Sequence, residues 1–184
     1  MIPRHIDLLT QLEKYRPADP LEARQQEAIV DLVVSSPEAF SRAHFTPGHV
    51  TASCFVVDER SGALLLHHHR RLDRWLQLGG HIEDGEHPAA AALREGSEES
   101  GLTDLAFVVD GIFDLDVHGI PPAKGEPEHR HFDVRYLART ASPEAVVIDR
   151  NESNDLAWVP LDRAAALMNE AASSRVIREI RSRL

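Results

Sequence analysis

Three glutamates between residues 95 and 99 constrain this chain more than any other feature. Glu95, Glu98 and Glu99 are spaced i, i+3 and i+4, so on a helix their side chains share one face within one turn. Pro88 suits the first turn of such a helix, and Gly101 suits the position just past its end. Like charges at these spacings repel by roughly 0.2–0.5 kcal/mol per pair, whereas a hard divalent cation is bound by several carboxylate oxygens. The pattern therefore predicts a helix over 88–100 that can present a metal site.

The wider segment Gly80–Leu102 resembles the Nudix box. Its fixed positions are Gly80, Glu86, Arg94-Glu95, Glu98-Glu99 and Gly101-Leu102, separated by five, seven, two and one residues. The alternative is a solvated acidic helix face, which is the usual meaning of a charge run, but that alternative does not account for the spacing of Arg94 and the glycines. Gly96 departs from the family pattern, which usually has an aliphatic residue there. Glycine inside a helix costs about 1 kcal/mol relative to alanine.

Composition limits the kinds of partner. The chain has 184 residues, a formal net charge of -10, 42% hydrophobic residues and 27% charged residues, as expected of a globular domain. The negative charge argues against binding to duplex nucleic acid or to an anionic membrane, since both need a basic surface. The single cysteine, Cys54, excludes an intrachain disulfide, and no apolar run approaches the roughly 20 residues of a membrane span. A cytoplasmic protein is expected.

Hydrophobic periodicity indicates a helical extension over residues 1–45 and a domain over 46–184. Residues 2–43 are expected to be helical with a break at Pro17 and Pro20, and the extension could pack on the domain, cover a cleft or form a homodimer contact. Further strands and helices are expected in the following ranges: strands over 50–58, 63–67, 75–78, 105–109, 111–118, 131–139 and 156–159, and helices over 162–168 and 174–184. Alternating strands and helices suggest an α/β/α sandwich with a mixed β-sheet, and the Nudix resemblance implies the same fold.

The resemblance also implies roles for individual residues. Glu95, Glu98 and Glu99 would be the ligands of Mg²⁺ or Mn²⁺, with Glu99 the central one. The remaining box residues would support them, as follows: Arg94 by holding the carboxylates, Glu86 by supporting the loop and helix ends, and Gly80 and Gly101 through backbone geometry. Family members often recruit a further acidic loop residue as a base or ligand, and Glu152 is the candidate here. The implied reaction is hydrolysis of a phosphoanhydride in a small diphosphate, such as a nucleoside diphosphate linked to another moiety.

Histidines are the second unusual feature, because the chain has 11 of them. His129 and His131 alternate by two, so on a strand both point to the same side. Together with His49 and His81 they could form a transition-metal site. His49 and His81 also look like metal-binding positions of isopentenyl-diphosphate isomerase. In that enzyme a cysteine two residues before the second histidine carries chemistry, and this chain has Gly79 there, which argues against isomerisation.

Two other functions stay open. One is a noncatalytic module that senses a nucleotide, although a sensor has no need for all three carboxylates. The other is an enzyme that uses the histidine site on a nonnucleotide diphosphate. Trp75, Phe113 and Phe132 could stack on a base, but aromatic residues in strands more often belong to the core.

Overall fold

The computed structural model describes residues 3–123, 125–151 and 153–184. The helices are α1 (Pro3–Lys14), α2 (Pro20–Ser35), α3 (Pro88–Ser100), α4 (Leu161–Met168) and α5 (Ser173–Arg181), with a 3₁₀ turn, η1, at Pro143–Ala145. The strands are β1 (Gly48–Asp58), β2 (Leu64–His69), β3 (Arg74–Leu76), β4 (Leu78–His81), β5 (Ala106–Phe107), β6 (Asp114–Ile120), β7 (His129–Thr140) and β8 (Ser153–Val159).

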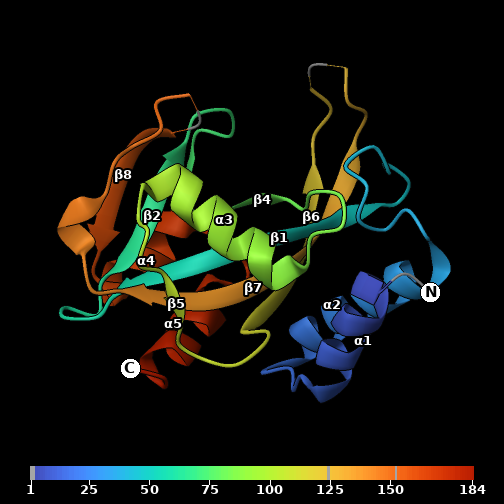
Figure 1. The fold of residues 1–184 in the computed structure, drawn as a ribbon, viewed down its shortest axis with the longest axis horizontal. Coiled ribbons are helices and arrows are strands. Elements are labelled where there is room, and N and C mark those ends of the chain that lie inside the picture. Colours follow the sequence, from blue (N-terminus) through green and yellow to red (C-terminus); the bar gives the residue numbers. More distant parts are fainter. Residues whose placement is uncertain (1–2, 124, 152) are drawn as a thin grey trace.

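All eight strands join one mixed sheet. Its main path runs β3-β2-β1-β7-β5, while β4 pairs with β1, β6 with β7 and β8 with β2. β1 and β7 are parallel over their whole length, from Gly48 opposite Arg130 to Asp58 opposite Thr140, and the other pairs are antiparallel. α3 lies across one face of the sheet and α4 and α5 lie on the other (Figure 1). The predicted α/β/α arrangement with a mixed sheet is confirmed.

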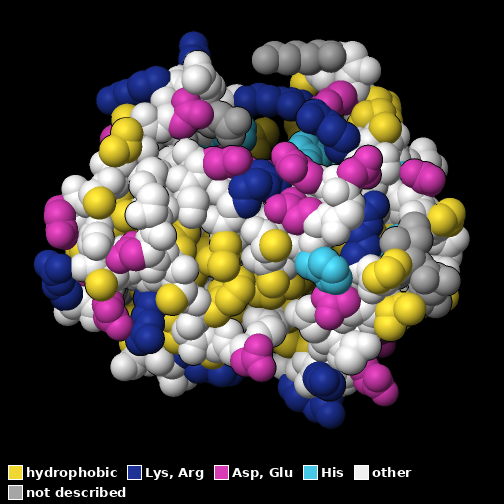
Figure 2. Space-filling model, viewed as in Figure 1, with side chains coloured by type: hydrophobic (Ala, Val, Ile, Leu, Met, Phe, Trp, Pro, Cys, Tyr) yellow, Lys and Arg dark blue, Asp and Glu magenta, His cyan; other side chains and the backbone are white. Residues whose placement is uncertain are grey.

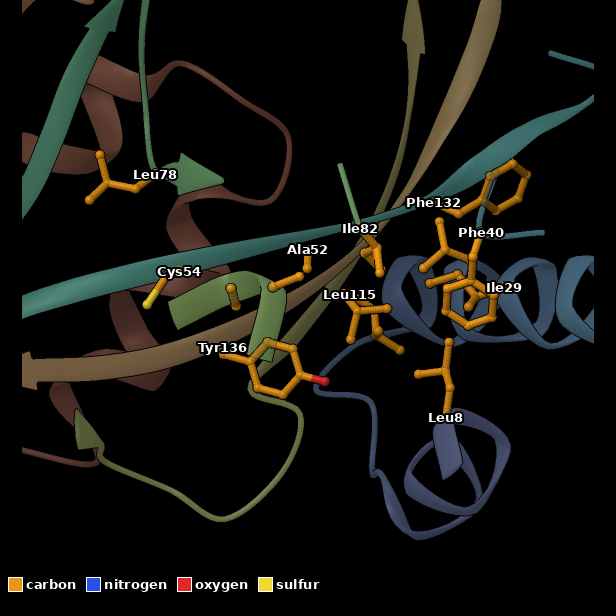
Figure 3. Packing of buried hydrophobic residues seen from close by; sticks show 14 of the residues in the cluster. Leu8, Ile29, Phe40, Ala52, Cys54, Leu78, Ile82, Leu115, Phe132 and Tyr136 are labelled. Atoms are coloured by element: carbon orange, nitrogen blue, oxygen red, sulfur yellow. The ribbon is translucent and has the colours of Figure 1, made fainter. Parts of the chain in front are cut away.

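The larger hydrophobic core lies between α3, the N-terminal helices and one face of the sheet (Figure 3). Ala52 and Cys54 point into it from β1, and Tyr136 points into it from β7. Leu8 of α1 and Ile29 of α2 belong to the same cluster and are fully buried. The helices α1 and α2 therefore share a core with the sheet and α3.

The opposite face of β1 and β7 changes character along the strands. At one end, Phe55 and Leu137 pack against α4 and α5 in a second hydrophobic cluster. Toward the other end, every second residue still points to this face, but these residues have polar side chains. Those of β1 are His49, Thr51 and Ser53, and those of β7 are His131, Asp133 and Arg135.

The charged side chains of this polar face belong to a network in the interior of the protein. Arg135 is 1% exposed, and its guanidinium donates to Asp133 at 2.9 Å, Asp116 at 3.0 Å and Asp114 at 3.4 Å. Charged groups inside a protein have to be paired in this way. Arg175 of α5 donates to Asp114 at 2.9 Å as well.

The extension is attached to the same network through Glu22 of α2. Its carboxylate is fully buried and accepts hydrogen bonds from the Tyr15 hydroxyl, the Ala18 amide at 2.6 Å and the Leu115 amide at 3.1 Å. A buried carboxylate that satisfies backbone donors on both sides of an interface holds the two parts in one position.

Most element positions agree with the expectations, within two or three residues at the ends. The helix expected to reach Ala43 is an exception, because α2 ends at Ser35 and residues 36–47 form turns. Phe113 and Phe132 are buried core residues and Trp75 packs at the edge of the second cluster, so the core interpretation of these aromatics holds. No helix among the described residues is long and apolar enough to cross a bilayer.

Candidate active site

The helix that carries the three glutamates forms as predicted. Pro88 occupies its first turn, and Gly101 ends it in the left-handed conformation with φ 73°, its amide donating to the Ser97 carbonyl at 2.8 Å. α3 packs on β1 and β4 through small residues. Gly96 explains its own departure from the family pattern, since a Cβ there would lie 3.1 Å from Leu105 and 3.5 Å from Cys54. Little room is left between α3 and β1 for an aliphatic side chain.

Arg94 is the centre of the site. Its guanidinium makes a bidentate pair with Glu86, with both N···O distances 3.0 Å, and it donates to Glu95 at 2.9 Å and to Glu98 at 3.0 Å. It also donates to the His81 carbonyl at 2.9 Å. Partial burial opposes ionisation of Glu86, but the bonds from Arg94 hold its pKa below the ordinary value. The planar fork of arginine thus ties the loop before α3 to the carboxylates on it.

The carboxylates of Glu95 and Glu99 lie against β4 at Gly79 and Gly80, where the strand has no side chains. Glu99 is 3% exposed and accepts the Gly79 amide at 2.7 Å. A Cβ on Gly80 would lie 2.7 Å from the carboxylate of Glu95. Glycine at position 80 therefore makes room for a carboxylate, which is more specific than the role in backbone geometry that the resemblance implied.

The three glutamates form a row from the interior to the solvent. The exposed fractions of their side chains are 4% for Glu99, 15% for Glu95 and 60% for Glu98. On the face shown in Figure 2, acidic and basic side chains gather over α3, beside a hollow above it. Oxygen ligands on one helix face, partly exposed and oriented by an arginine, have the chemistry that Mg²⁺ or Mn²⁺ requires. The residues present fit such an ion.

One residue without an expected role lies next to Glu99. His67 of β2 is buried, with Nδ1 3.6 Å from the Glu99 carboxylate and 2.8 Å from the Ser153 hydroxyl. Burial lowers the pKa of His67 to about 4, so the ring is neutral at pH 7. Strand alternation within His67-His68-His69 could have shown that His67 points inward, but nothing in the sequence indicates its contact with Ser153. Glu152, predicted as a base or further ligand, lies outside the described residues.

The four predicted histidines come together beside this site. The parallel register places His49 opposite His131, and β4 places His81 opposite Thr51. The ring of His49 lies 5.1 Å from that of His81, 5.2 Å from that of His129 and 4.9 Å from that of His131, between centroids. The structure therefore brings together, from β1, β4 and β7, the four histidines that the sequence analysis grouped.

The sequence is similar to those of two known hydrolases. The chain is 30% identical over 128 residues to the CMP-5'-(N-acetyl-N-hydroxy-3-aminopropyl)phosphonate hydrolase of Streptomyces rubellomurinus, covering 68% of this chain but 58% of that protein. It is 28% identical over 144 residues to a probable DHNTP pyrophosphohydrolase of Lactococcus lactis subsp. cremoris, covering 76% of this chain and 81% of that protein.

Solved structures share the fold. The Ap4A hydrolase of C. elegans, in a binary complex, superposes with a TM-score of 0.58 at 21% identity, covering 72% of this chain and 95% of that one. A NUDIX family hydrolase from Clostridium perfringens gives a TM-score of 0.55 at 28% identity, covering 73% and 97%. The sequence profile described as NUDIX domain matches residues 47–180, which is most of the chain. The protein belongs to the NUDIX family.

Proposed function

We propose that this protein is a divalent-metal-dependent hydrolase that cleaves a phosphoanhydride bond in a nucleoside diphosphate linked to another moiety, or in a related diphosphate. The observation that carries the proposal is the row Glu95, Glu98 and Glu99, held by Arg94 and seated on the glycines of β4. The relatives named above are a CMP-phosphonate hydrolase and a probable DHNTP pyrophosphohydrolase, and hydrolysis of a phosphorus-containing compound is common to this proposal and to those names.

The roles of the chain's own residues follow from their contacts. The three glutamates would hold Mg²⁺ or Mn²⁺, which when bound neutralises diphosphate oxygens and lowers the pKa of water. The Gly79 amide fixes the orientation of Glu99, and Arg94 fixes that of Glu95 and Glu98. Glu152 is retained as the proposed base or further ligand. Residues 1–45 are proposed to be an extension of a domain over 46–184, in line with a family match that begins at residue 47.

Two alternatives are weaker. A nucleotide sensor without activity would not need three glutamates positioned by an arginine. An isomerase that uses a thiol two residues before His81 conflicts with Gly79, where φ is 154° and a Cβ would lie 2.6 Å from the Ser53 Cα. No cysteine fits at that position without moving the backbone of β1.

The test is phosphate release from a panel of diphosphates, coupled to a phosphatase or pyrophosphatase, with Mg²⁺ and separately with Mn²⁺. Glu99→Gln keeps the shape of the side chain and removes its charge, and we expect a loss of about 100-fold or more, since metal-supplied stabilisation is several kcal/mol and each 1.4 kcal/mol is tenfold. Glu144→Gln is the matched control, because Glu144 is 70% exposed on η1 and pairs with Arg60. Binding of nucleotides without turnover in either metal would favour the sensor instead.

A further inference from the structure

Hydrogen bonds fix the tautomers of two histidines in the cluster at the end of the polar face. His49 is 1% exposed and His129 is 5% exposed. The Nδ1 atom of His49 lies 3.3 Å from the His44 carbonyl, and the Nδ1 atom of His129 lies 2.8 Å from the Pro127 carbonyl. A carbonyl only accepts, so Nδ1 carries the proton in both rings and Nε2 carries the lone pair.

Two ring nitrogens of the cluster lack protein partners. Within the described residues, Nε2 of His49 and Nε2 of His131 are buried without a hydrogen bond. Buried polar atoms are almost always satisfied, so each such atom in a folded protein needs an explanation. Metal-ligating histidines commonly donate one ring nitrogen to a backbone carbonyl and leave the other free for the ion.

The distances between the ligand atoms support the same explanation. One ring nitrogen from each of His49, His129 and His131 lies within 4.8 Å of the other two. A tetrahedral ion with metal–nitrogen bonds of about 2.0–2.1 Å separates its ligands by roughly 3.3 Å, so small rotations of the rings would complete the geometry.

We propose that His49, His129 and His131 bind a transition-metal ion of the Zn²⁺ class at a second site, separate from the carboxylates of α3. Imidazole ligands favour Zn²⁺, Cu²⁺, Ni²⁺ or Fe²⁺ over Mg²⁺, which prefers oxygen. The fourth position faces His81, whose ring centroid lies 5.1 Å from that of His49 and 5.4 Å from that of His131. Three protein ligands with a fourth position for a ring or a small molecule is the usual form of an open zinc site.

The two sites differ in their ligands but are neighbours in the fold. The His81 carbonyl accepts a hydrogen bond from Arg94, which holds Glu95 and Glu98. Because the ligand types differ, competition between Mg²⁺ and a transition-metal ion can show which ion binds the carboxylates and which binds the histidines. The second site does not depend on the proposed hydrolysis, and either can fail alone.

The test uses full-length protein without a histidine tag, stripped of metal with a chelator. Co²⁺ is the probe, because imidazole-bound tetrahedral Co²⁺ absorbs visible light, and the titration is run in excess Mg²⁺ to saturate carboxylates. We expect one equivalent of Co²⁺ to bind to the wild type and to Glu99→Gln. In His131→Gln we expect binding to be more than about 100-fold weaker, beyond the 10–100-fold cost of losing an outer partner.

His87→Gln is the matched control, because His87 is 48% exposed and pairs with Asp7 outside the cluster; it should bind Co²⁺ as the wild type does. Displacement of Co²⁺ by Mg²⁺, or full binding by a folded His131→Gln, would overturn the proposal. If circular dichroism shows that His131→Gln is unfolded, X-ray absorption of the Zn²⁺-loaded wild type decides. Scattering from three imidazoles supports the site, and a shell of oxygens alone refutes it.

Discussion

Replacement of Arg135 by methionine should destabilise the protein far more than replacement of any surface arginine. Arg135 is 1% exposed, and its guanidinium pairs with the buried Asp114 and Asp133 and the half-buried Asp116 at 2.9–3.4 Å. Methionine has a similar length and leaves these carboxylates without their common cation. Removal of one partner from a buried ion network costs about 3–5 kcal/mol. Individual charged hydrogen bonds at roughly 1.5–3 kcal/mol each would sum to more, but contributions within one network do not add.

Arg139→Met is the matched control on the same strand. Arg139 pairs with the carboxylate of Glu59 at 3.0 Å, but, unlike those of the Arg135 network, these two side chains are 51% and 44% exposed. Exposed pairs contribute about 0–1 kcal/mol. Urea unfolding at pH 7, followed by tryptophan fluorescence, should give a difference of at least about 2 kcal/mol between the two variants. Similar free energies of unfolding for both would refute the argument from burial.

The pH dependence of Arg135→Met tests the electrostatic part of the argument. In the wild type, burial opposes ionisation of Asp116, but Arg135 lowers its pKa below the ordinary value. This stabilisation is complete above the unfolded pKa of about 4 and is lost only as pH falls from there toward the lower folded pKa, because the unfolded chain takes up the proton first. Without Arg135, the effect of burial on the pKa of Asp116 is opposed only by the contacts with His118 and Gln25. The pKa therefore rises, and the folded variant gains stability relative to the wild type as pH falls. The difference between the two proteins should therefore shrink from pH 7 to pH 4.5, and a constant difference would contradict it.

Three further predictions concern other parts of the molecule. Gly80→Ala should displace the carboxylate of Glu95, which lies 2.7 Å from the added Cβ, and raise the Mn²⁺ concentration needed for half-maximal activity by about tenfold or more; an unchanged Mn²⁺ dependence would contradict the close approach. Glu22→Gln should cost about 1–3 kcal/mol and speed proteolytic cleavage within residues 3–45, because its fully buried carboxylate accepts amides from both the extension and β6; equal cleavage rates would show that Glu22 does not hold the extension. Burial raises the pKa of the Cys54 thiol to about 12, so at pH 8 the native protein should not react with iodoacetamide while the urea-unfolded chain should; rapid labelling of the native protein would disprove its burial.

The acidic helix was predictable from the sequence because its determinants are local. Proline at position 88, glycine at position 101 and the spacing of three glutamates lie within 14 residues, and helix geometry converts such spacing directly into a shared face. The family resemblance added the proposed roles of Arg94 and Glu86, and in the structure these two side chains form a bidentate pair. The strands were also predictable in position, since apolar runs bounded by turn residues lie in sequence order.

Only the tertiary structure decided what lies opposite each strand. The histidine cluster exists because β1 and β7, about 80 residues apart, pair in parallel with His49 opposite His131, and a shift of one residue would turn these rings to the other face. Arg135 and Glu22 carry charges, and a charge is expected at the surface until a partner distant in the sequence is known. Glycine at position 96 looks like a defect in a helix until Cys54 and Leu105 are seen to fill the space. Local spacing thus determined the acidic helix, whereas register and packing determined the polar interior and the histidine site.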